Sequence, residues 1–183
     1  LEADVVVDVE AVAEATRTVV AGSTLASVEQ RARDLGRELD PSRDLETLTW
    51  ATAASGRERS AADYASALRV LHGTGRQLAA FFQQYDLLLS PTLATPPPHL
   101  GALSLDQEDV SGYVEHLLQT IAFTQLMNVT GNPAMSVPLA TSHEGLPIGI
   151  QVAAPFGDEA TLFRLAGQLE AAAGWSQRRP SLS

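Results

Sequence analysis

The longest stretch without a charged residue is the feature that most constrains the fold of this chain. Residues 116–142 contain no Asp, Glu, Lys or Arg, and a helix of that length could cross a bilayer. The stretch also carries Gln119, Asn132, Pro133 and Pro138, which a lipid-exposed helix could not satisfy. We therefore expect this segment to be buried inside a soluble protein, with no membrane partner.

Three apolar runs predict buried strands. Residues 86–91 form a short run that ends at a proline, and residues 134–139 and 148–153 flank a turn through Gly145 and Pro147. The last two runs carry no charge on either face. Such strands are typical of a central sheet that is covered on both sides.

Helical patterns surround these strands. Ser60 and Asp63 form a capping box before a long apolar stripe, and Asp158 and Gly174 are suited to begin and end the last helix. An alternative for the acidic start of the chain is a short strand near residues 4–9. The expected helices are 5–39, 45–54, 61–85, 115–128 and 158–173. No boundary divides the chain, so residues 1–183 are expected to form a single α/β domain.

Composition excludes several classes of function. The formal net charge is -10, and such a surface repels nucleic-acid phosphates. The chain has no cysteine, so disulfides and thiolate metal sites are excluded. Residues 1–10 lack the basic and apolar regions of a secretory signal. We expect a cytoplasmic protein whose sequence here begins inside a longer chain.

Residue chemistry alone offers no active site. All twelve basic residues are arginine, so neither a lysine base nor a phosphate loop of the Walker type can be present. The four histidines, His72, His99, His116 and His143, have no partner at catalytic or metal-ligand spacing. We therefore expect no catalytic residue, no metal ligand and no cofactor within this sequence.

Several ordered motifs resemble the amidase-signature family. Residues 128–138 read NVTGNPAMSVP and resemble the family pattern N-x-T-G-x-P-A-x-S-x-P, and residues 145–151, GLPIGIQ, match the G-L-P-x-G-x-Q that follows it. Residues 85–92, YDLLLSPT, are similar to the family's Y-D-x-L-x-x-P-T strand, and the whole resemblance runs over about residues 45–175. Within the family, residues 81–82, 96–98 and 162–165 look closest to bacterial amidases related to 6-aminohexanoate-cyclic-dimer hydrolase.

The resemblance implies the carboxy-terminal portion of an α/β/α sandwich with a mixed central sheet. It also implies a serine hydrolase of carboxamides that uses a Ser-cis-Ser-Lys triad and needs no cofactor. The family places that triad and its Gly/Ser-rich loop in the amino-terminal part, and this sequence has neither a lysine nor such a loop. We therefore expect the chain alone to be inactive and to depend on a missing amino-terminal half. In the complete enzyme, its expected partner is a small-molecule amide.

Two alternatives stay open. The first is a glutaminase-like subunit of a tRNA-dependent amidotransferase, which shares the fold. The second is a non-catalytic binding or assembly module that reuses the half-fold. Homo-oligomer formation also stays open.

We expect the end of the helix before Gly131 to line the substrate pocket. Phe123, Thr124, Met127 and Asn128 recur at helical spacing and combine apolar walls with polar groups. The competing interpretation is that Thr124 and Asn128 only bond the helix end. Gln151 lies in a buried strand and is expected to brace a neighbouring loop by hydrogen bonds.

Overall fold

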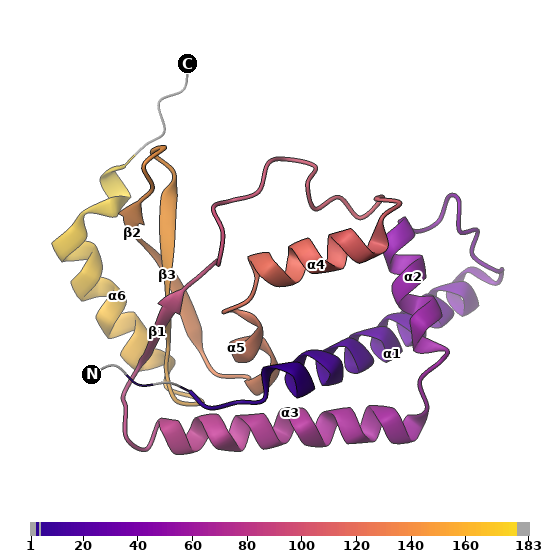
Figure 1. Cartoon of the computed structure of the whole chain (residues 1–183), viewed down its shortest axis with the longest axis horizontal. Helices are drawn as coiled ribbons and strands as arrows, with labels where there is room; N and C mark the ends of the chain where they lie inside the picture. The colour runs from indigo at the N-terminus through magenta and orange to yellow at the C-terminus, as the bar shows by residue number, and fades with distance from the viewer. Residues whose placement is uncertain (1–2, 4, 179–183) are drawn as a thin grey trace. The chain divides into compact units, whose positions relative to one another are not determined.

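Three helices open the chain, and the strands follow among and between the later helices (Figure 1). This computed structural model describes residue 3 and residues 5–178. The elements are α1 (Val9–Leu35), α2 (Thr47–Gly56), α3 (Ala61–Phe81), β1 (Leu88–Pro91), α4 (Val110–Thr120), α5 (Gln125–Thr130), β2 (Ala134–Thr141), β3 (Pro147–Ala153) and α6 (Glu159–Ala173), followed by a short 3₁₀ turn, Trp175–Gln177.

The elements gather into two compact units. Leu1–Gln77 and Pro98–Leu118 form the first, which we call the helical unit, and Leu78–Pro97 and Gln119–Ser183 form the second, the sheet unit. The chain passes from one to the other three times. That residues 1–183 make one domain stays a prediction.

Close approach between α1 and α2 organises the helical unit. A Cβ atom at Gly56 would lie 2.5 Å from the carbonyl oxygen of Ala21, so only glycine fits there. Tyr64 of α3 packs over Gly22 of α1 in the same way, 3.1 Å from where a Cβ would lie. Small residues on α1 therefore let its neighbours approach its backbone.

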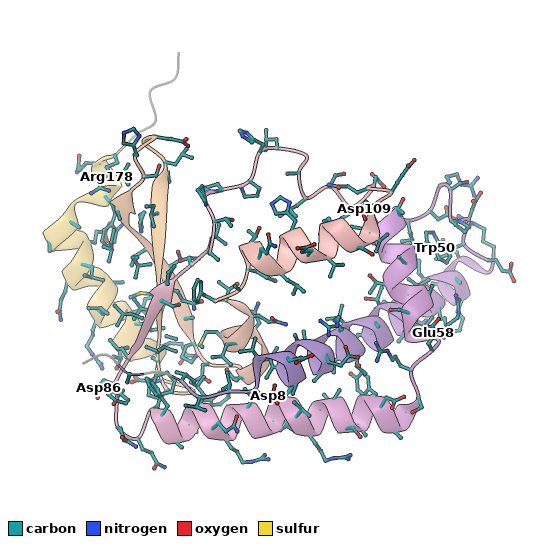
Figure 2. The ribbon with its side chains drawn as sticks, viewed as in Figure 1. Asp8, Trp50, Glu58, Asp86, Asp109 and Arg178 are labelled. Carbon is teal, nitrogen blue, oxygen red and sulfur yellow. The ribbon has the colours of Figure 1, made fainter. Side chains whose placement is uncertain are left out.

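Local capping sets the helix ends in this unit. The Asp8 carboxylate accepts from the Ala11 N–H at 3.0 Å, and Gly36 ends α1 at φ 63° (Figure 2 labels Asp8). The helix predicted over 5–39 is thus too long at both ends, because both caps lie inside it. The Ser60–Asp63 capping box is confirmed, with Asp63 N–H donating to Ser60 Oγ and Ser60 N–H donating to Asp63 Oδ2.

The carboxylates with lowered pKa values lie in the helical unit and have structural partners. Hydrogen bonds from Arg17 and then Arg59 lower the pKa of Glu14. The bidentate Arg37 guanidinium holds the pKa of the Asp44 carboxyl far below its ordinary value. A general base needs a pKa near the working pH, and these lowered pKa values move away from it. The two carboxylates are therefore members of surface ion pairs, which stabilise a fold only slightly.

Among the residues that the structure describes, the sheet unit contains three strands in the order β1-β3-β2. Both strand pairs are antiparallel, with Ser90 and Ser136 each opposite Gln151. The predicted α/β class is confirmed. The family resemblance also implied a mixed sheet, which would need a further strand parallel to one of these three. The pairing of β2 shifts between Val137 and Ala140, around Pro138, whose missing N–H cannot join a regular ladder.

One face of this sheet packs against α6 (Figure 1). Its core is Val137, Val152, Ala154 and Leu162, with Leu165, Leu169 and Trp175 packed around them. The predicted start of α6 is confirmed, because the Asp158 carboxylate accepts from both the N–H and the hydroxyl of Thr161.

The charge-free residues 116–142 do not form one long helix. They make the end of α4, a turn, α5 and β2. Within residue 3 and residues 5–178, no helix has the length and apolarity to cross a membrane.

Candidate functional site

The connection between α4 and α5 is the main departure from the sequence-based prediction. A single helix was expected over 115–128, but α4 ends at Thr120 and α5 begins at Gln125. The Ile121 carbonyl accepts from the N–H groups of both Thr124 and Gln125, which closes a tight turn. We call residues 121–124 the pocket turn, because two of the predicted pocket residues, Phe123 and Thr124, lie in it.

Two groups distant in sequence hold this turn. The Thr120 carbonyl accepts from the Ala94 N–H at 3.2 Å. The Phe123 carbonyl accepts from the Gln151 side-chain amide at 3.1 Å. Because these carbonyls bond to the β1–α4 loop and to β3, the helix breaks here although its local sequence favours continuation.

The four predicted pocket residues now occupy different environments. Phe123 is 40% exposed and lies in the turn with Thr124, whose hydroxyl donates to the Ile121 carbonyl. Met127 is 5% exposed and belongs to the core, whereas Asn128 is exposed. The break removes the single helical face on which the four were expected, and their pocket role stays a prediction.

A row of polar side chains crosses the sheet. Gln151 is 5% exposed, and its amide donates to Ser90 Oγ at 3.0 Å as well as to the Phe123 carbonyl. This confirms the expectation that Gln151 braces a neighbouring loop. Since alternate residues of a strand share a face, this row lies on the face away from Val152 and the α6 core.

A second polar pair lies beside this row, and the sequence analysis missed it. The hydroxyls of Thr92 and Ser136 are 2.6 Å apart. A Cβ at Gly149 would lie 2.7 Å from Ser136 Oγ and 2.8 Å from Thr92 Oγ1. Gly149 therefore leaves the space in which these hydroxyls meet. Residues in or directly after three separate strands contribute to this contact, so only the strand register could have revealed it.

An apolar pocket opens at the ends of these strands, entirely within the sheet unit. Its volume is about 310 Å³. Its lining comes from Pro91 at the end of β1, from residues 93–97 after that strand, and from Ser142 and residues 146–149 in the β2–β3 turn and the start of β3. Thr95 Oγ1 is buried there, and no hydrogen-bond partner is found for it among the described residues. The Pro-rich segment that follows β1 thus forms one wall of this pocket.

The histidines and acidic residues form no metal cluster in the described part of the chain. His72, His99 and His143 are exposed. Over residue 3 and residues 5–178, no cluster of three or more His, Asp or Glu side chains could hold a metal ion. The lysine that a Ser-cis-Ser-Lys triad requires is missing from the sequence itself.

Together, the strand register, the α6 layer and the ordered motifs define an amidase-type α/β segment, and the comparisons agree. The family model "Amidase" matches residues 5–163, so the chain belongs to the amidase family. That match begins upstream of residue 45, where the motif resemblance began.

Individual relatives support the same assignment. "Putative amidase AmiC" of Mycobacterium bovis is 39% identical over 155 residues, which cover 84% of this chain and 32% of that protein. The 6-aminohexanoate-cyclic-dimer hydrolase of Paenarthrobacter ureafaciens is 32% identical over 161 residues, 85% of this chain and 32% of that protein. A solved 6-aminohexanoate cyclic dimer hydrolase complexed with substrate superposes with a TM-score of 0.83 at 29% identity, over 94% of this chain and 38% of that one. The chain thus spans about a third of the length of these relatives.

Proposed function

We propose that the complete protein is an amidase that hydrolyses the C–N bond of small-molecule carboxamides by a Ser-cis-Ser-Lys triad. The family match over residues 5–163 carries this proposal. Because the 183 residues contain no lysine, the triad in this proposal belongs to the remainder of the complete protein. The reaction needs no cofactor, and the cytoplasm is its proposed location.

In this proposal, residues 1–183 supply sheet strands and part of the substrate pocket. The pocket turn presents Phe123 with its side chain partly exposed, and α5 carries the exposed Asn128 five residues further along the chain. An aromatic wall and a nearby amide are suited to hold an acyl chain and orient a polar group. The reacting atoms would meet the nucleophile and the oxyanion donors from the remainder of the enzyme.

The test is hydrolysis by the complete enzyme of a panel that includes an aryl amide, an aliphatic amide, the 6-aminohexanoate cyclic dimer and glutamine. We expect hydrolysis of at least one of the first three, and its loss when the serine nucleophile is replaced. Glutamine as the sole substrate would instead favour the amidotransferase-subunit alternative. Failure on every amide would contradict the proposal.

Phe123→Ala and Asn128→Ala in the complete enzyme should change substrate preference. We expect the kcat/KM ratio between a bulky and a small amide to change on the order of tenfold, because one apolar contact discriminates by about that factor. Both side chains are exposed, so stability should fall by less than about 1 kcal/mol. Steady-state kinetics and thermal melting measure the two effects.

Phe163→Ala is the matched control. Phe163 is 78% exposed on α6, away from the pocket turn in sequence, and its removal should leave the kcat/KM ratio unchanged. If the Phe123 and Asn128 variants unfold readily while their folded fraction keeps the parent's preference, both residues are structural and the pocket assignment is wrong.

A further inference from the structure

The side chain of Gln151 joins three parts of the sheet unit that are far apart in sequence. It lies in β3, opposite Ser90 of β1 and Ser136 of β2. Its amide nitrogen has two donor hydrogens, and its acceptors are Ser90 Oγ at 3.0 Å and the Phe123 carbonyl at 3.1 Å. With the side chain 5% exposed, both bonds are largely shielded from water.

The bond to Phe123 is the one that bears on the pocket turn. If this bond broke, the buried amide would lose an acceptor and keep its full desolvation penalty. The hydrogen-bonded arrangement is therefore strongly favoured. The carbonyl of Thr120, directly before the turn, accepts a hydrogen bond from the Ala94 N–H. The backbone of residues 121–124 is therefore placed by β3 and the β1–α4 loop rather than by a continuous helix.

We propose that Gln151 is a positioning residue that selects among the acyl groups of amide substrates. By fixing the Phe123 carbonyl, Gln151 fixes the direction in which the partly exposed Phe123 ring leaves the backbone. The ring then forms a rigid wall that favours extended or bulky acyl groups over short ones. This inference rests on the proposed amidase function and deepens it, because Gln151 would act on the substrate through Phe123.

The test compares three variants in the complete enzyme. Gln151→Met keeps the length and volume of the side chain but removes both donors. Gln151→Asn keeps the amide but shortens the side chain by one methylene, so the amide no longer reaches the Phe123 carbonyl. This variant replaces Gln151→Met in the test if the methionine variant does not fold. Ser90→Ala is the matched control, because it removes the other bond and leaves the one to Phe123.

Kinetics separates positioning from a general loss of structure. For the Gln151 variants we expect KM for a bulky acyl amide to rise on the order of tenfold relative to a short one, since a misplaced wall weakens the contacts that hold the substrate. We expect kcat per folded molecule to change less than twofold, because the triad lies elsewhere. Ser90→Ala should keep the parent's KM ratio.

An NMR measurement reads the bond itself, independently of activity. Residues 123–124 are the only Phe-Thr pair in the 183 residues. Labelling Phe carbonyls with ¹³C and Thr amides with ¹⁵N therefore gives a signal from the peptide bond between Phe123 and Thr124. The signal is assigned by its disappearance in a Thr124→Ser variant, which lacks the labelled amide. The signal should shift in Gln151→Met and stay in place in Ser90→Ala.

The outcomes are distinct. A shifted signal together with a changed KM ratio supports the positioning role. An active enzyme whose Gln151 variants keep the parent's signal or the parent's KM ratio overturns that role alone. A parent that hydrolyses no amide overturns both the proposed function and this role.

Discussion

Replacing Leu162 by alanine should lower the free energy of unfolding of the sheet unit by about 2–4 kcal/mol. Leu162 is 5% exposed and packs with Val137, Val152 and Ala154 between α6 and the sheet. Truncation removes apolar contacts and leaves a cavity that rigid strands cannot fill, and such changes typically fall in this range.

Urea unfolding measures the effect in the 183-residue chain. Trp175 packs against this core, so its fluorescence reports on the sheet unit once Trp50 is replaced by phenylalanine. Phe163→Ala is the control, because it removes a larger side chain one residue away that is 78% exposed. We expect it to change stability by less than about 0.5 kcal/mol. Equal losses in the two variants would contradict the packing of α6 on the sheet.

Gly149→Ala should destabilise the sheet unit by about 1–3 kcal/mol, the usual range for an added methyl group without space. The new Cβ would lie 2.7 Å from Ser136 Oγ and 3.1 Å from Thr92 Cβ. Threonine is branched at Cβ and cannot turn away by a side-chain rotation alone. The 2.6 Å bond between the Thr92 and Ser136 hydroxyls should therefore break.

Gly167→Ala gives the matched comparison. A Cβ at Gly167 meets no atom within 4 Å, and alanine in a helix interior is favoured over glycine by about 0.5–1 kcal/mol. The same substitution should thus stabilise α6 and destabilise β3. A Gly149→Ala protein as stable as the parent would show that strand β3 does not lie this close to Thr92 and Ser136.

The sequence predicted the elements whose causes are local. Asp158 begins α6, Gly174 ends it, and the Ser60–Asp63 box precedes α3, because a cap and its acceptors lie within a few residues of each other. The three strands also fall where charge-free runs meet Gly and Pro. Gly36 could have ended α1 at the right place if its capping preference had been preferred to Pro41 as the signal that stops the helix.

The pocket turn could not be predicted in this way. Locally, residues 115–128 favour a helix, and the break depends on Ala94 and Gln151, which lie far away in sequence. The apolar pocket and the Thr92–Ser136 contact likewise require the register of β1, β3 and β2. The motifs identify the family, while the fine shape of the site depends on tertiary pairing.

Amide hydrolysis by the purified 183-residue chain, measured beside the complete enzyme, tests the central claim most directly. That claim is that these residues build a pocket wall and contain no catalytic group. We expect the chain to give no turnover of aryl or aliphatic amides above the buffer rate, and the complete enzyme to hydrolyse them. Turnover by the chain that survives repurification, and that disappears when one of its own serines is replaced, would contradict the account.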